Sequence, residues 1–178
     1  MGYCPGGRTQ VLVDGVKDFS AVTGADEWVG GLYDGKIRVP LGGLKKLDLE
    51  ARRVLIHELT HAFVQSKTRG NCPRWLHEGL AQLAEPRALR RSELAALARD
   101  VRAGDPASWP DKAFTYPSAL SLTRFLEARR GFDLLVNLLD RLGDGDSVDA
   151  AFSALYGQSY GELAAEWAES LHTEHGER

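Results

Sequence analysis

The sequence predicts an α+β fold, in which a small N-terminal β-sheet packs on a long helix and a mainly helical C-terminal half follows. β-branched and aromatic residues gather in residues 9–13 and 28–40, residues 49–67 repeat apolar side chains at helical spacing, and the pattern beyond Pro86 is helical. The chain of 178 residues is long enough to bury one core, so we expect a single domain. Its expected parts are a β-rich part at 1–45, two central helices at 46–86 and a helical part at 87–178.

The predicted β-sheet rests on a hairpin signal. Asp34-Gly35 stands between Leu32-Tyr33 and Ile37–Val39, which indicates a two-residue turn between two strands. Asp48 is the expected N-cap of the long helix, and Arg69-Gly70-Asn71 is expected to end it. The next helix begins at Pro73 and runs to Pro86.

Five more helices are expected in the C-terminal half, separated by Gly, Pro and Asp clusters. They cover about 90–102, 117–130, 132–142, 147–156 and 160–172. The apolar residues Trp75, Leu76, Leu80 and Leu83 are expected to pack on the preceding long helix. The stretch with Arg87, Arg90 and Arg91 is typical of a solvated face, and His172 and His175 are expected to lie in a disordered or exposed tail.

Composition excludes several partners. The 22 Lys and Arg residues face 25 Asp and Glu residues, a net charge of -3, so neither nucleic acid nor an anionic membrane surface is expected as a partner. No apolar run is long enough for a membrane span or a signal peptide, but localisation stays open, because the first residues read like the edge of a longer protein. We expect Cys4 and Cys72 to be unpaired thiols, although two cysteines can also form one disulfide. Composition does not predict the oligomeric state.

The strongest chemical signal is His57-Glu58-Leu59-Thr60-His61. Two histidines four residues apart on a helix share one face, where both can bind a single Zn²⁺ ion. Glu58 is rotated by about 100° from His57 and is placed to act as a general base rather than as a ligand. Such a pentamer also arises by chance, but this helix is apolar on nearly every side, and burial of three polar groups without a metal is costly.

A catalytic zinc site takes three protein ligands and leaves one position open. The candidate for the third ligand is Glu78, which lies on the next helix, in the segment Trp75-Leu76-His77-Glu78-Gly79-Leu80-Ala81. A short reversal between two antiparallel helices brings this carboxylate back toward the two histidines.

HELTH followed by WLHEGLA resembles the gluzincin metallopeptidases, the clan of thermolysin and the aminopeptidase-N-like enzymes, over residues 57–81. The resemblance implies a zincin-like fold and one catalytic Zn²⁺, with His57, His61 and Glu78 as ligands and Glu58 as base. The chain departs from the aminopeptidases in its shorter gap of sixteen residues between His61 and Glu78 and in the absence of a G-x-M-E-N segment. The resemblance therefore does not imply aminopeptidase specificity.

His77 takes the place of the asparagine in the usual W-L-N-E-G pattern. It is either a helix residue that points away from Glu78, or a competing ligand or hydrogen-bond donor behind the metal ligands.

Two further features are expected to serve the reaction. In gluzincins the substrate lies along the edge of the N-terminal sheet, and residues 28–40 are either this substrate strand or a simple cover for the core. Tyr116 resembles a tyrosine that begins the corresponding helix in small gluzincin-like domains, and it is the expected donor to the oxyanion. Its alternative is a tyrosine that only packs at a helix start, and Tyr33, Tyr156 and Tyr160 are lesser candidates.

These residues together predict a zinc-dependent metallopeptidase that hydrolyses peptide bonds in a peptide or protein substrate, with an endopeptidase favoured over an aminopeptidase. The main alternative is a catalytically silent, zinc-containing binding or regulatory module derived from a peptidase. A third hypothesis is a catalytic fragment of a larger polypeptide. The ligand types constrain the metal only loosely, so Mn²⁺, Co²⁺ and Ni²⁺ remain possible occupants.

Overall fold

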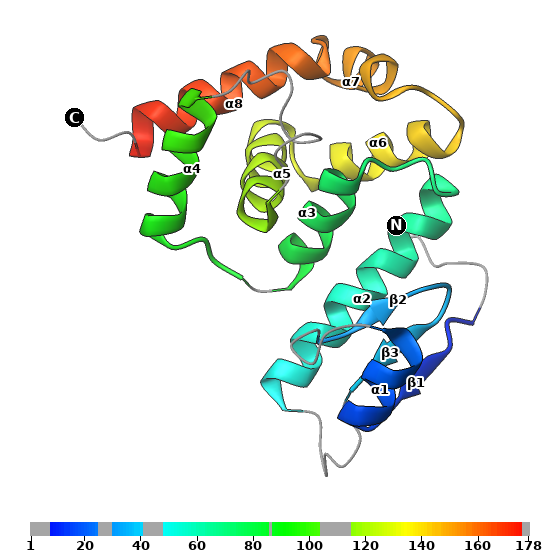
Figure 1. The fold of residues 1–178 in the computed structure, drawn as a ribbon. Coiled ribbons are helices and arrows are strands. Elements are labelled where there is room, and N and C mark those ends of the chain that lie inside the picture. Colours follow the sequence, from blue (N-terminus) through cyan, green and yellow to red (C-terminus); the bar gives the residue numbers. More distant parts are fainter. Residues whose placement is uncertain (1–7, 25–29, 41–47, 86, 104–114, 176–178) are drawn as a thin grey trace.

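A computed structural model describes residues 8–24, 30–40, 48–85, 87–103 and 115–175 (Figure 1). Within these residues the chain forms eight helices and a three-stranded sheet, which confirms the predicted α+β class. Cys4, Pro86 and residues 28–29 of the predicted strand lie outside the described residues, and Cys72 is a free thiol. No helix in the described part of the chain has the length and the apolar run that a membrane crossing requires.

The sheet consists of β1 (Val11–Val13), β2 (Leu32–Tyr33) and β3 (Ile37–Val39), in the order β1-β3-β2. β1 and β3 are parallel, whereas β2 and β3 form the predicted antiparallel hairpin. Three residues rather than two join the hairpin, because Tyr33 pairs with Ile37, and Gly35 adopts a φ of 96° within the turn. Within the described residues, β2 therefore forms one edge of the sheet.

Helix α1 (Val16–Thr23) follows β1 and was not predicted from the sequence. It spans only eight residues and begins after Gly15 without a side-chain cap, so its local signal is weak. Gly24 ends it with a φ of 68°, and its backbone N–H donates to the carbonyl of Ser20. Because parallel strands require a crossover connection, this helix occupies part of the path from β1 to β3.

The central helix α2 (Leu49–Thr68) lies between the N-terminal sheet and the C-terminal helices (Figure 1). Its N-cap is Asp48, as predicted, and the Asp48 carboxylate accepts a hydrogen bond of 2.8 Å from the backbone N–H of Ala51. The helix ends at Arg69, which has a left-handed φ of 54°, and Gly70 follows with a φ of 84°. A short connection leads to α3 (Arg74–Ala84).

The helices of the C-terminal half agree closely with the predicted ranges. They are α4 (Arg91–Ala103), α5 (Tyr116–Arg130), α6 (Phe132–Gly143), α7 (Val148–Tyr156) and α8 (Tyr160–His175). Thr115 and Ser118 form a reciprocal capping box at the start of α5. The expectation of an exposed or disordered tail was wrong for His172 and His175, because α8 continues through both residues and leaves both half-buried.

Helix α3 is held between α2 and the other C-terminal helices. Leu80 faces α2, but Trp75, which is 1% exposed, stacks on Tyr160 of α8 at 5.4 Å between ring centroids. Trp75 thus packs on α8 as well, a partner that the sequence did not predict, and it belongs to the same core cluster as Val64 of α2. On the α5 side, a Cβ added to Gly79 would lie 2.0 Å from Oγ1 of Thr123, so this close approach of the two helices requires glycine.

Candidate metal centre

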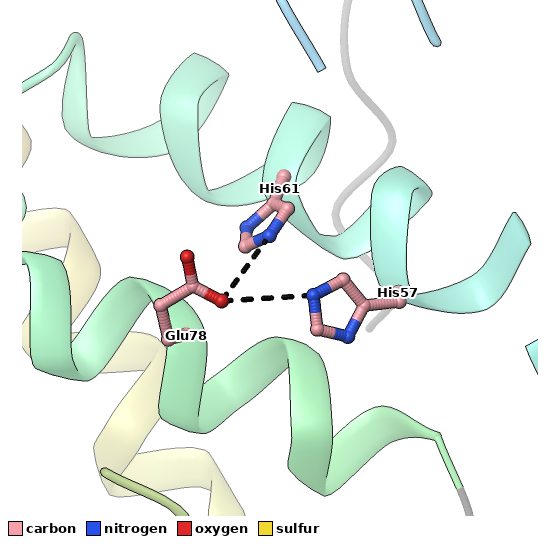
Figure 2. A group of neighbouring side chains, drawn as sticks. All are labelled: His57, His61 and Glu78. Carbon is pink, nitrogen blue, oxygen red and sulfur yellow. Dashed lines mark ion pairs between the residues drawn. The ribbon is translucent and has the colours of Figure 1, made fainter. Parts of the chain in front are cut away.

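The structure brings His57, His61 and Glu78 together between α2 and α3 (Figure 2). The two histidines lie one turn apart on α2, and Glu78 points at both of them from α3. Oε2 of Glu78 is 3.6 Å from Nε2 of His57 and 3.6 Å from Nε2 of His61. One ligand atom from each residue lies within 4.8 Å of the other two.

This donor set fits a tetrahedral zinc ion. Nitrogen and oxygen ligands at about 2.1 Å from zinc lie about 3.4 Å from one another in a tetrahedron, close to the 3.6 Å that separates Oε2 of Glu78 from Nε2 of each histidine. Oε2 of Glu78 and Nδ1 of His61 are also buried without a hydrogen-bond partner among the described residues. A buried carboxylate oxygen without a partner is costly, and a bound cation at this point would remove that cost.

The charges of the protein couple these three side chains. Burial lowers the pKa of His57, but its contacts with Glu78 and Glu85 outweigh burial and raise that pKa to about 9. Burial lowers the pKa of His61 to about 4, against the opposing charge of Glu78. Burial favours the neutral form of Glu78, but His57 and His61 outweigh it and lower the pKa of this carboxyl. Without a metal, a protonated His57 thus faces an ionised Glu78 at neutral pH.

Glu85 is a site residue that the sequence analysis missed. It caps the C-terminus of α3, and its Oε1 lies 3.5 Å from Nδ1 of His57. Its Oε2 lies 3.5 Å from Nη2 of Arg53, so one carboxylate bridges the imidazole and the guanidinium. A carboxylate at Nδ1 leaves Nε2 directed at the metal position. Glu85 follows Glu78 by seven positions, which is about two helical turns, and this spacing was the available signal.

Glu58 lies beside the three candidate ligands rather than among them, and its side chain is turned toward the sheet. The residue is only 5% exposed. Burial raises the pKa of Glu58 to about 7, with the charges of Glu78 and Glu85 adding and that of His57 opposing. A Cβ placed on Gly31 would be 2.8 Å from Cγ of Glu58 and 2.9 Å from its Oε1. The backbone that enters β2 therefore touches the carboxylate directly.

A pocket of about 290 Å³ brings the three candidate ligands and Glu58 into one space. It is lined by Gly31, Leu32, Tyr33, His57, Glu58, His61, His77, Glu78 and Tyr116. The pocket thus meets the edge of the sheet, both metal-site helices and the start of α5. A larger apolar cavity of about 370 Å³ lies between α2, α3 and α6, but no ionisable side chain lines it.

The four tyrosines considered as hydrogen-bond donors to the oxyanion separate into two groups. Tyr116 and Tyr33 line the pocket, whereas Tyr156 stacks on Phe152, Tyr160 packs against the same ring at a tilt, and neither of these two lines the pocket. Burial and the charge of Glu78 raise the pKa of Tyr116, although Arg74 opposes both, so the phenol keeps its proton at neutral pH. The hydroxyl group of Tyr116 can therefore act as a hydrogen-bond donor within this pocket.

His77 does not point out of the site, because its side chain lines the pocket next to His61. Its ring stacks on that of His61, with centroids 4.5 Å apart and planes inclined by 14°. Burial lowers the pKa of His77, so the ring is neutral at pH 7. It lines the pocket but does not belong to the group of three candidate ligands.

Gln82 is a second residue that the sequence analysis missed. This buried side chain donates 3.2 Å to the carbonyl of Glu78 and 3.0 Å to that of Tyr116. It ties the helix that carries the third candidate ligand to the start of α5. No local pattern around a single glutamine predicts such a bridge, because its partner is 34 residues away.

Comparison with known proteins gives one match. A family model described as the peptidase MA superfamily matches residues 16–173, which is most of the chain. No curated protein and no solved structure is similar enough to count as a match. The matched span includes the pocket and every residue that lines it.

Proposed function

The chain belongs to the peptidase MA superfamily, and from this premise we propose that it is a zinc-dependent metallopeptidase of the gluzincin type that cleaves peptide bonds. The observation that carries the proposal is the convergence of His57, His61 and Glu78 in a pocket that also contains the buried carboxylate of Glu58. A site that serves only folding needs no such base, and it closes its fourth position with a protein ligand.

His57, His61 and Glu78 would hold one zinc ion, with Glu85 fixing the orientation of His57. Zinc, when bound, supplies Lewis acidity, which makes a water molecule more acidic and polarises the carbonyl of the scissile bond. In the metal-free protein at neutral pH, Glu78 is ionised and His61 is neutral. Only His57 must therefore lose a proton before it can bind zinc.

Glu58 would accept the proton from the attacking water and then deliver it to the departing amine. Burial supports this role, because a pKa of about 7 lets the carboxyl both take and release a proton near neutral pH. Tyr116 would donate its phenolic hydrogen to the oxygen that becomes negative as the water attacks. These are the roles that the resemblance to gluzincins implies for both residues.

The substrate would lie along β2, whose backbone lines the pocket at Gly31, Leu32 and Tyr33. Among the described strands β2 pairs only with β3, and an extended peptide would pair with its other edge. We favour an endopeptidase, because the chain lacks the segment with which the aminopeptidases bind a free amino terminus.

The test is Glu58→Gln. We expect the variant to keep one zinc per chain and to lose peptide cleavage by about 10²- to 10⁴-fold, the usual contribution of a general base. Zinc is measured by mass spectrometry of the purified protein and cleavage with quenched fluorescent peptides. Glu169→Gln, an exposed residue on α8, is the matched control and should behave as wild type. Full cleavage by Glu58→Gln would contradict the proposal.

The alternative is a zinc-containing binding or regulatory module without turnover, and the position of His77 favours it. Its ring stacks on His61 inside the pocket, where a small rotation would offer a fourth ligand. X-ray absorption spectroscopy of the zinc-loaded protein discriminates the two functions. Three histidines around zinc would support the module, and two histidines with a solvent ligand would support the enzyme.

A further inference from the structure

The two histidines of the candidate metal centre are held in different ways. Nδ1 of His57 lies 3.5 Å from Oε1 of Glu85, so a carboxylate holds this ring from behind. Nδ1 of His61, in contrast, is buried and has no hydrogen-bond partner among the described residues. A histidine that binds a metal usually owes the orientation of its ring to a polar contact at the second nitrogen. His61 lacks that contact, so another contact must orient its ring.

The ring of His77 covers one face of His61. The ring centroids are 4.5 Å apart and the planes are inclined by only 14°. His57 also contacts the His61 ring, with centroids 4.7 Å apart, but its plane stands at 88° to that ring, whereas His77 lies flat against it. The bond that joins a histidine ring to its side chain permits a broad range of ring angles. A turn of His61 about this bond would drive the edge of its ring into His77, so the stack restricts the plane of the ring.

The plane of the His61 ring decides where this residue can bind a metal. Each imidazole nitrogen binds a metal through a lone pair that lies in the plane of the ring. In the observed plane, Nε2 of His61 lies 3.6 Å from Oε2 of Glu78, which is itself 3.6 Å from Nε2 of His57. A turned ring would direct the lone pair of His61 away from the point between these three atoms. The stack therefore keeps His61 in the orientation that the candidate metal site needs.

The parallel rings also limit what the nitrogens of His77 do in this arrangement. Because the plane of His77 is nearly parallel to that of His61, its lone pairs run beside a metal held in the plane of His61 and not toward it. For the same reason the two rings form no hydrogen bond with each other, since the donor and acceptor directions of both lie in parallel planes. His77 would have to leave the stack to become a fourth ligand.

We propose that His77 is a positioning residue, which packs its ring flat on His61 and so keeps Nε2 of His61 directed at the metal. The stack replaces the polar contact that Glu85 supplies to His57. The proposal rests on the zinc site of the proposed function but not on peptide cleavage. It assigns the role to the flat ring of His77 and not to its nitrogens. Phenylalanine, which has a flat ring without nitrogen, should therefore take the place of His77.

The zinc affinity of variants of the full chain tests this role. His77→Ala removes the ring, His77→Leu fills most of the space without a flat face, and His77→Phe keeps a ring without nitrogen. Zinc dissociation constants are measured by competition with a chromogenic chelator, and folding of the metal-free variants by circular dichroism. We expect His77→Ala and His77→Leu to bind zinc about 10- to 100-fold more weakly than the wild type, the usual effect of losing a residue behind a ligand. His77→Phe should bind zinc about as tightly as the wild type.

The absorption spectrum of the Co²⁺-loaded protein shows whether the coordination changes. The visible bands of Co²⁺ depend on the identity and the geometry of its ligands. We expect His77→Phe to keep the wild-type bands and His77→Leu to alter them. His175→Ala is the matched control, because it removes a histidine at the end of α8, outside the pocket. This control should change neither the zinc affinity nor the spectrum.

Equal losses of zinc affinity in His77→Phe and His77→Leu would show that a nitrogen of His77 is needed and would overturn the stacking role. Wild-type affinity in folded His77→Leu would overturn it as well, and this variant decides the outcome where His77→Ala does not fold. A wild type that binds no zinc would refute both proposals. The expected order of affinities without cleavage of any peptide would keep the role of His77 and refute the peptidase. Cleavage together with affinities that do not depend on residue 77 would keep the peptidase and refute the role of His77.

Discussion

Gly31→Ala tests whether contact between the sheet and the proposed base sets the rate of the reaction. The new methyl carbon would lie 2.8 Å from Cγ and 2.9 Å from Oε1 of Glu58, and 3.0 Å from Cγ1 of Val54. Favourable contacts between heavy atoms of this kind lie at about 3.5–4.0 Å, so Glu58 or the strand must move by about 0.7 Å or more. Glu58 is only 5% exposed, so its side chain has little free space in which to move.

A displacement of about 1 Å in a catalytic group costs about 10²-fold in rate. We therefore expect kcat/KM of Gly31→Ala to fall by about 10- to 100-fold while the zinc content stays at the wild-type level. The assays are peptide cleavage, zinc analysis and thermal unfolding. Gly30→Ala is the matched control, because its methyl carbon meets only Val54, at 3.1 Å or more, and does not touch the base. Wild-type kcat/KM in folded, zinc-loaded Gly31→Ala would refute the reasoning.

Two further predictions concern the packing of α3 and the protonation of His57. Gly79→Ala should lower the free energy of unfolding by about 2 kcal/mol or more in urea titrations, because its Cβ would lie 2.0 Å from Oγ1 of Thr123; unchanged stability would contradict the close packing of α3 on α5. Zinc binding should release a proton from His57 at pH 7, since its pKa is about 9 and only the neutral ring binds metal. The affinity should therefore rise about tenfold per pH unit from pH 7 to 9 and then level off. Calorimetry in buffers of different ionisation enthalpy measures the release. In Glu85→Gln the levelling should move to lower pH, and zinc binding without proton release in the wild type would refute the assignment.

The sequence predicted those parts of the site that depend on local geometry. His57 and His61 share a helix face because four residues make about one turn, and this relation does not depend on the rest of the fold. Glu78 lies on the next helix, after one reversal of the chain. The resemblance of residues 57–81 to a two-part motif already implied that its carboxylate faces the two histidines. In the structure all three side chains meet, although the metal itself remains a proposal.

The residues that were missed act through contacts that no local pattern encodes. Glu85 reaches His57 from the end of another helix, and Gln82 reaches Tyr116 across 34 residues. Only the fold shows that Gly31 lies against the carboxylate of Glu58.

The position of Gly79 connects the C-terminal half to the metal centre. Adjacent helix residues point about 100° apart, so if Gly79 faces α5, Glu78 is turned away from α5 toward α2. The lack of a side chain at Gly79 lets α3 approach α5 closely, and Gln82 reinforces this approach through its bond to Tyr116. A larger residue at position 79 would push α3 toward α2 and change the distance from Glu78 to both histidines. The C-terminal helices α4–α8 thus set the position of the third candidate ligand, although none of the three candidate ligands lies on them.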